Sequence, residues 1–359
     1  MSSTTVASPV ISVVVPCYNS GWSVGDTLLS IRAQSFRDFE IILIDDGSTE
    51  DLSEALASHR ADPRLRVVRQ ENRGLAGARN RGLAEARAGY VAFIDADDLW
   101  HPDFLSRSLA ALRADLAAPY AFALCFHLDE RNRYLAPSVW EGLSPRHDLI
   151  GLVDVNLVGN GSASLFRTDA VRAAGGFDET LRLRGATGAE DWKLCLQMAA
   201  LGRPAMLGDP LVGYRRVLAG MSQGDPRRQM RSAELVIADL APLLPQVPRR
   251  SWRNARLIMA GWLVPAYHRA GLHLDMVLLM AGAYLADPLF LLSVNVRLAH
   301  RRKLRQVLDG LLKRVPDQHG QPVAALREPD GRRPFAFLGP SCAAGSLPVA
   351  AGPAPPNGL

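Results

Sequence analysis

Three aspartates, Asp95, Asp97 and Asp98, directly follow the apolar run Tyr90–Ile94. Carboxylates this close together repel one another and raise one another's pKa unless a cation lies between them. Mg²⁺ and Mn²⁺ prefer carboxylate oxygens and bind through one or two of them together with the phosphates of a substrate. The cluster therefore indicates a site for a divalent metal and a diphosphate. A solvated acidic turn is the alternative interpretation of these three residues when they are taken alone.

Two further apolar runs end in polar residues. Phe39–Ile44 is followed by Asp45 and Asp46, and Ile11–Val15 is followed by Pro16, Cys17, Tyr18 and Asn19. The stretches between the runs have apolar residues at helical spacing, and strands that alternate with helices predict a mainly parallel sheet. Because the carboxyl ends of parallel strands lie along one edge, Tyr18, Asp46 and the three aspartates are expected to line one crevice.

Length and composition limit the class of protein. A chain of 359 residues with 48% hydrophobic residues can bury one good-sized core and an accessory one. Its net charge of +5 is mild and the basic residues form no single long run, so nucleic acid is not a predicted partner. The four cysteines lack C-x-x-C spacing, residues 1–10 do not resemble a signal peptide, and no apolar stretch is long enough to cross a bilayer. These features predict a cytoplasmic protein.

The chain divides by composition into four parts. We expect a flexible N-terminus over residues 1–9, a region over 10–225 that carries every motif, a helical accessory region over 226–315, and a disordered tail rich in Pro, Gly and Ala over 316–359. Residues 297–315 combine apolar helical spacing with many Arg and Lys residues. Such a helix can lie on the anionic face of a membrane, or it can be a surface helix with a solvated basic side. A peripheral membrane contact is therefore one of two interpretations.

Five separated motifs resemble those of the family 2 glycosyltransferases, in the order and spacing of that family. They are Val13–Asn19, Gln34–Ser48, Asn72–Asp98, Gly175–Glu179 and Glu190–Trp192. The resemblance covers most of the first 220 residues and implies an α/β fold of the GT-A type. In this fold a Rossmann-like, mixed but mainly parallel sheet is flanked by helices, and here the helical module and the tail would follow it.

The resemblance also implies roles for individual residues. Pro16, Tyr18, Asn19 and Asp46 match the site of the nucleotide base, Arg79 and Asn80 match a pair near the base and ribose, Asp95 and Asp97 match the signature acidic motif, Asp97 or Asp98 would hold the metal, and Asp191, beside Glu190, matches the catalytic base. Where the family often has a histidine two residues after the arginine, this chain has Val217 after Arg215 and Arg216. Either arginine could supply positive charge to the phosphates instead.

Separate structural explanations exist for some of these residues. Glu190 and Asp191 could merely serve the N-terminus of their helix, and Arg79 could be a surface arginine. Asp45 is expected to cap the turn that follows it, which would leave only Asp46 for binding.

The chemistry of glycosyl transfer fits the residue types. An acceptor hydroxyl must lose its proton to a positioned base, and the departing diphosphate needs a metal and donors to stabilise its charge. The resemblance implies inverting transfer of one sugar, because the signature of processive members is missing. We expect a nucleotide-sugar donor, with a UDP-sugar favoured, and a saccharide or lipid-linked acceptor in polysaccharide or glycoconjugate synthesis, with Mn²⁺ or Mg²⁺ as cofactor. Two alternatives stay open: a metal-dependent phosphoryl or nucleotidyl transferase, and an inactive module that binds nucleotide sugars.

Overall fold

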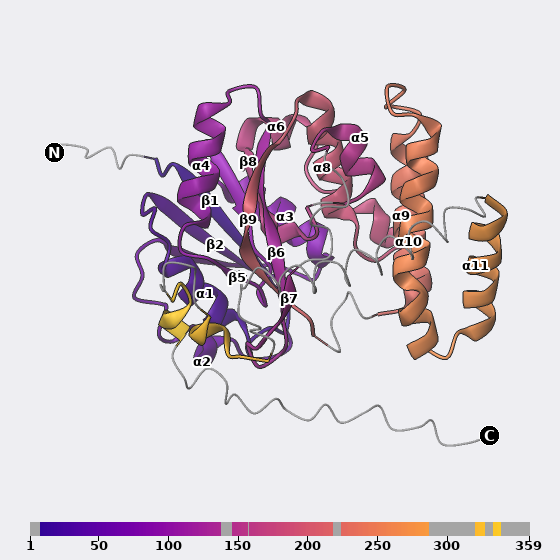
Figure 1. The fold of residues 1–359 in the computed structure, drawn as a ribbon. Helices are drawn as coiled ribbons and strands as arrows, with labels where there is room; N and C mark the ends of the chain where they lie inside the picture. The colour runs from indigo at the N-terminus through magenta and orange to yellow at the C-terminus, as the bar shows by residue number, and fades with distance from the viewer. Residues whose placement is uncertain are drawn as a thin grey trace, which may run out of the picture.

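The computed structural model describes residues 8–137, 146–156, 158–217, 224–286, 320–326 and 333–338. One nine-stranded sheet forms its centre (Figure 1). The strands are β1 Ile11–Cys17, β2 Phe39–Asp45, β3 Leu65–Arg69, β4 Tyr90–Phe93, β5 Leu99–Trp100, β6 Tyr120–Leu128, β7 Tyr134–Pro137, β8 Ser164–Arg167 and β9 Ala205–Arg215.

The sheet is mixed, with a parallel half and a mainly antiparallel half. Its order is β3-β2-β1-β4-β8-β6-β9-β5, with β7 paired to β6 off this path. Strands β3, β2, β1 and β4 run parallel, whereas β8 is antiparallel to both β4 and β6. The register aligns Cys17 with Asp45, so β1 and β2 end side by side. The mixed, mainly parallel sheet flanked by helices that the sequence predicts is confirmed.

Helices cover both sides of the sheet and extend it on one flank. They are α1 Val24–Arg32, α2 Ser53–Leu56, α3 Gly74–Glu85, α4 Phe104–Ala114, α5 Leu149–Asp154, α6 Thr168–Ala173, α7 Thr180–Leu183, α8 Glu190–Leu201, α9 Pro226–Leu240, α10 Arg249–Arg269 and α11 His273–Ala286, with short 3₁₀ turns at Gly161–Ala163, Val323–Ala325 and Ala336–Leu338. Helix α1 shows why the pattern folds this way, because its apolar positions Val24, Leu28 and Ile31 are all buried.

The first two helices after residue 225 pack directly on the region over residues 10–225. Buried residues of α9 and of the first half of α10 belong to the same hydrophobic cluster as the sheet. Helix α11 lies outermost on this flank, packed on α10 (Figure 1). None of the helices that the structure describes is long and apolar enough to cross a membrane. The basic stretch 297–315 lies outside the described residues.

The structure describes two short segments within the predicted tail, residues 320–326 and 333–338. Val323, Leu326, Phe335 and Leu338 are buried in a hydrophobic cluster with Leu99, Phe126 and Leu128 of the sheet. The composition of residues 316–359 is poor in apolar residues, but these four side chains have a preformed apolar surface to bury against. The disorder expected for residues 316–359 as a whole stays a prediction.

Candidate active site

The strand tips predicted to form a crevice do lie along one edge. Asp46 N donates to Cys17 O at 2.8 Å, which ties the residue after β2 to the end of β1. Strand β4 pairs with the other side of β1 and ends just before the acidic cluster. The parallel register is what brings together residues about 30 and 50 positions apart in the chain.

The loop after β1 presents the Tyr18 ring to solvent. Asn19 has a left-handed backbone (φ 50°), and its Oδ1 accepts Thr49 N at 2.9 Å while its own N donates to Ser48 Oγ at 3.1 Å. Pro16 is buried within β1, and Tyr18 is 48% exposed. Pro16 and Asn19 thus shape the loop, and Tyr18 offers the aromatic face on which a base can stack.

Asp46 holds the loop that leads into α3. It is buried (2% exposed) and accepts from Arg73 N at 2.9 Å, Gly74 N at 2.8 Å and Gln70 Nε2 at 2.7 Å. Both of its oxygens are therefore engaged by protein donors at the start of the helix. Asp45 accepts Ser48 N at 2.9 Å, so the capping of the following turn by this residue is confirmed.

The three clustered aspartates have different environments. Asp98 is fully buried, and its carboxylate accepts Asn160 Nδ2 at 2.9 Å, Ser162 Oγ at 2.5 Å and Arg215 N at 3.0 Å. Asp95 and Asp97 are partly exposed. Asp98 therefore points inward with both of its oxygens occupied by donors of the protein, whereas Asp97 is partly accessible.

Burial and mutual repulsion raise the pKa of two of these carboxyls. Desolvation, with a contribution from Asp95, raises the pKa of Asp97 to about 6, and the nearby Arg215 opposes the shift. Desolvation and the neighbouring carboxylates also raise the pKa of Asp98. A carboxylate whose charged form is this costly gains from a cation beside it.

Arg79 connects the acidic cluster to the start of α8. Its guanidinium is 1% exposed and donates to Asp95 Oδ1 and to Glu190 Oε1, each at 2.7 Å. Although desolvation lowers it, the pKa of Arg79 is raised on balance by these carboxylates, so the arginine is permanently charged. Gly161 leaves room for this side chain, because a Cβ there would lie 2.3 Å from Arg79 Nη2. Arg79 is thus a buried bridge rather than a surface arginine.

Helix α8 begins with the two residues predicted to be catalytic. Ala189 precedes it in a left-handed conformation (φ 67°), Glu190 is buried against Arg79, and Asp191 is partly exposed. Asp191 Oδ1 accepts the backbone N of Trp192 at 2.7 Å. Desolvation raises the pKa of Glu190 to about 7 and also raises that of Asp191, although Arg79 opposes both shifts. A carboxylate that is desolvated but still partly accessible is suited to accept a proton.

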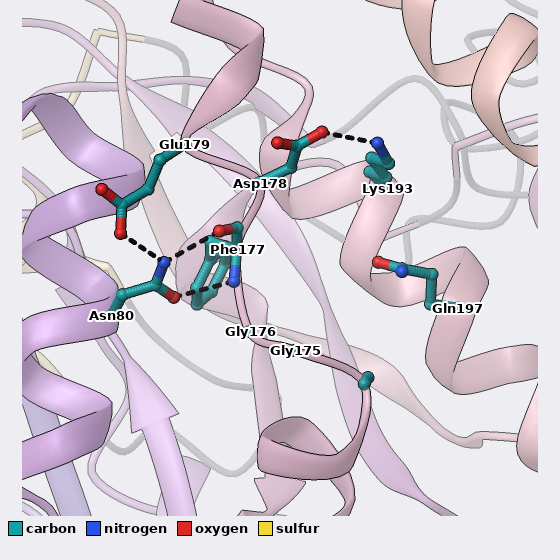
Figure 2. A pocket seen from close by; sticks show the side chains of 9 residues that line it. Asn80, Gly175, Gly176, Phe177, Asp178, Glu179, Lys193 and Gln197 are labelled. Atoms are coloured by element: carbon teal, nitrogen blue, oxygen red, sulfur yellow. Dashed lines mark hydrogen bonds and ion pairs between the residues drawn. The ribbon is translucent and has the colours of Figure 1, made fainter.

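Asn80 lies away from the strand tips. Its side chain accepts Phe177 N at 2.8 Å and donates to Phe177 O at 2.8 Å and Glu179 Oε1 at 2.9 Å, as Figure 2 shows. It lines a pocket of about 370 Å³ with the turn 174–179, Lys193 and Gln197. The side chain of Asn80 therefore clamps this turn, and the residues that line the pocket include none of the strand-tip aspartates.

Arg215 at the end of β9 and Arg216 just after it lie in different surroundings. Arg215 is buried, and its Nε donates to the carbonyl oxygen of Asp97 at 2.6 Å. Arg216 lies with its guanidinium 5.9 Å from the Tyr214 ring, and its backbone N donates to Leu128 O. Arg215 thus lies at the acidic cluster, and Arg216 packs on its neighbour.

Several residues of the site were not predicted from the sequence. Ser162 donates to Asp98 and accepts Asp95 N at 3.0 Å, and Asn160 also donates to Asp98. Their only signal in the sequence is the short Gly-Asn-Gly-Ser segment from Gly159, which reads as a turn. Turn residues can serve as donors, but a turn motif does not say to which acceptor.

Known proteins resemble the first half of the chain. Residues 12–173 match the model of glycosyl transferase family 2. These residues form a family 2 glycosyltransferase domain. The putative teichuronic acid biosynthesis glycosyltransferase TuaG of Bacillus subtilis is 41% identical over 103 residues, which cover 28% of this chain and 41% of TuaG. Chondroitin synthase of Escherichia coli is 26% identical over 220 residues, 61% of this chain and 30% of that enzyme.

The comparison of structures gives the same fold. The structure of S. aureus TarS 1-349 in complex with UDP-GlcNAc superposes with a TM-score of 0.55 at 20% identity, covering 72% of this chain and 73% of TarS. At this identity the likeness establishes the fold alone. The chain spans between 15% and 41% of the length of curated relatives such as these.

Proposed function

We propose that this protein transfers a single sugar from a UDP-sugar to an acceptor hydroxyl, with inversion at the anomeric carbon. The observation that carries the proposal is the Arg79 bridge, which brings the acidic strand tip at Asp95 and the start of α8 at Glu190 to one place. One side of this bridge suits the diphosphate and the other offers a proton acceptor. The complex of TarS with UDP-GlcNAc, a protein of the same fold, supports the choice of donor.

The residues present fit a divalent metal held together with a diphosphate. The structure describes no group of three or more His, Cys, Asp or Glu residues that could hold an ion alone. Asp97 is partly exposed and carries a raised pKa, so it supplies one oxygen ligand and gains from a cation, and the phosphates of the donor would supply others. When bound, Mn²⁺ or Mg²⁺ would neutralise charge on the leaving diphosphate.

The protein side chains then divide the remaining work. Tyr18 stacks on the base, and Arg215 holds the backbone of Asp97. Asp191 takes the proton of the acceptor hydroxyl. The hydroxyl oxygen forms a bond to the anomeric carbon as the bond from that carbon to the diphosphate breaks. Arg79 keeps the strand tip and α8 at a fixed separation during the step. The acceptor is a saccharide or a lipid-linked saccharide, and the class of product is a polysaccharide or glycoconjugate. The name of TuaG, which refers to teichuronic acid biosynthesis, supports this class of product.

The test compares binding with transfer in Asp191→Asn. We expect UDP binding in the presence of Mn²⁺, measured by calorimetry, to stay within about two-fold, because Asp191 is not placed at the diphosphate. Transfer from UDP-sugars should fall by about 10²- to 10⁴-fold, the usual cost of losing a general base. Full activity in this variant would exclude Asp191 as the base. A wild-type protein that binds no nucleoside diphosphate, with or without Mn²⁺, would overturn the proposal itself.

A further inference from the structure

The segment 320–326 pairs with the hairpin that joins β6 to β7. Tyr134 N donates to Gln321 O at 2.8 Å, Gly320 N donates to Tyr134 O at 2.7 Å, and Val323 N donates to Asn132 O at 2.6 Å. These bonds add the returning chain to the exposed side of the hairpin. They fix the backbone of Asn132 from outside the catalytic sheet.

Apolar contacts anchor the same region next to the acidic cluster. Phe335 packs with its ring 5.5 Å from that of Phe126 and 5.9 Å from that of His101. Val323 shares this hydrophobic cluster with Leu99, the residue that directly follows Asp98. The C-terminal segments therefore contact the sheet immediately beyond the aspartates.

Asn132 links this segment to α1. It is 4% exposed and has a left-handed backbone (φ 57°). Its Nδ2 donates to Asp26 Oδ2 at 2.8 Å, and Asp26 lies in the first turn of α1. A buried amide in this conformation, more than 100 residues from its partner in the chain, specifies where the Asp26 carboxylate lies.

Asp26 in turn faces the guanidinium of Arg215. Asp26 Oδ2 lies 3.5 Å from Arg215 Nη2, and the side chain of Arg215 is 1% exposed. The guanidinium also lies 5.4 Å from the Trp22 ring. Because a guanidinium is a rigid plane, the carboxylate near Nη2 restricts the orientation of the whole group, including its Nε–H. That Nε–H donates to the carbonyl oxygen of Asp97 at 2.6 Å.

We propose that Asn132 and Asp26 are positioning residues, held by the C-terminal segments 320–326 and 333–338, that fix Arg215 against Asp97 and so set the site for the metal and the diphosphate. The inference rests on the proposed function, because it concerns how the same site binds its donor. It makes the returning C-terminal chain a working part of the catalytic domain.

The test uses two variants of the link and one control. Asn132→Gly keeps the left-handed backbone and the carbonyl that accepts Val323 N, and removes only the amide that reaches Asp26. Asp26→Asn removes the charge that faces Arg215. Val323→Ala removes apolar contacts from the same segment and leaves the link intact, so it reports the effect of lost stability alone.

We expect each link variant to weaken the affinity for UDP in the presence of Mn²⁺ by about 5- to 10-fold in calorimetry, the usual size of coupling through a packed network. The double variant should bind UDP no more weakly than the single variant with the lower affinity, since both changes break one connection. Val323→Ala should lower the Tm while its UDP affinity stays within about two-fold of the wild type, at temperatures where it is folded.

Three outcomes separate the alternatives. Folded link variants with wild-type affinity would overturn the inference and leave the proposed function standing. An equal loss of affinity in Val323→Ala and Asn132→Gly, with an equal fall in the Tm of both variants, would overturn it as well, because lost stability alone would then explain both losses. A wild-type protein that binds no UDP would remove the proposed function and this inference together.

Discussion

Replacement of Arg79 by methionine tests the bridge on which the active site depends. The change keeps the length of the buried side chain and removes the two 2.7 Å charge-assisted bonds to Asp95 and Glu190. Removal of one partner from a buried ion pair costs about 3–5 kcal/mol, because the other charge is left uncompensated. We expect Arg79→Met to lose about this much stability above neutral pH.

The loss should depend on pH in a defined direction. The ordinary pKa of Glu190 is 4.5, burial raises it to about 7, and Arg79 opposes that rise, so the pKa in Arg79→Met should be higher than in the wild type. A group whose pKa is raised on folding binds more protons in the folded state, and stability falls as pH rises from the unfolded value through the folded one. Near pH 5 Glu190 is protonated, and the cost should shrink to about 1–3 kcal/mol for unmade hydrogen bonds.

Urea unfolding of the wild type and the variant at about pH 5 and pH 8 measures both quantities. The double variant Arg79→Met with Glu190→Gln is the matched control, because it lacks the ionisable group. The pH-dependent part of the loss should shrink in this control, and what remains should come from Asp191 and Asp97, whose raised pKa values Arg79 also opposes. An equal loss at both pH values, or a pH dependence as large in the double variant as in Arg79→Met, would refute the reasoning.

Three other predictions follow from the geometry of single residues. Gly161→Ala should lower stability by about 1–3 kcal/mol, because its Cβ would lie 2.3 Å from Arg79 Nη2. The control Gly89→Ala has open space around its Cβ, so its stability should stay within about 0.5 kcal/mol of the wild type. Thermal unfolding distinguishes the two variants. Tyr18→Ala should weaken UDP binding by about 1–3 kcal/mol in calorimetry, because its 48% exposed ring is placed to stack, and Tyr18→Phe should bind like the wild type; equal affinity of the Ala variant would exclude stacking. Gly282→Ala should stabilise the protein by about 1 kcal/mol, because this glycine lies inside α11 with nothing within 4 Å of a new Cβ; a lower Tm would contradict this expectation.

The strands that carry the site could be predicted from local pattern. The runs Ile11–Val15, Phe39–Ile44 and Tyr90–Ile94 correspond to β1, β2 and β4, because a continuous apolar run is typical of a strand buried on both faces. The parallel topology then placed their tips on one edge. Strand β9 was not predicted, since Gly208, Asp209 and Pro210 interrupt its pattern and its pairing with β6 shifts register nearby.

The direction of side chains at the strand tips could not be predicted in this way. After β4 the chain turns, with Asp98 N donating to Asp95 O at 3.0 Å, so the alternation of a strand no longer determines which aspartate faces inward. Asn80 follows Arg79 on an α-helix, where adjacent residues do not share a face. One reaches the acidic cluster and the other reaches the turn at Phe177, and only tertiary contacts distinguish them.

The balance of charge at the site supports the proposal that Asp97 meets the metal and the donor. Arg79 is already shared between Asp95 and Glu190, and Arg215 is held by a carboxylate of α1 while it donates to a backbone carbonyl. Within the part of the chain that the structure describes, no side chain donates a hydrogen bond to the Asp97 carboxylate. Among the described residues the two buried cations therefore stabilise the frame, and they reach the Asp97 carboxylate only through longer-range attraction. A carboxylate left in this state beside a crevice is most stable when a ligand brings the positive charge, which is what a metal–diphosphate complex does.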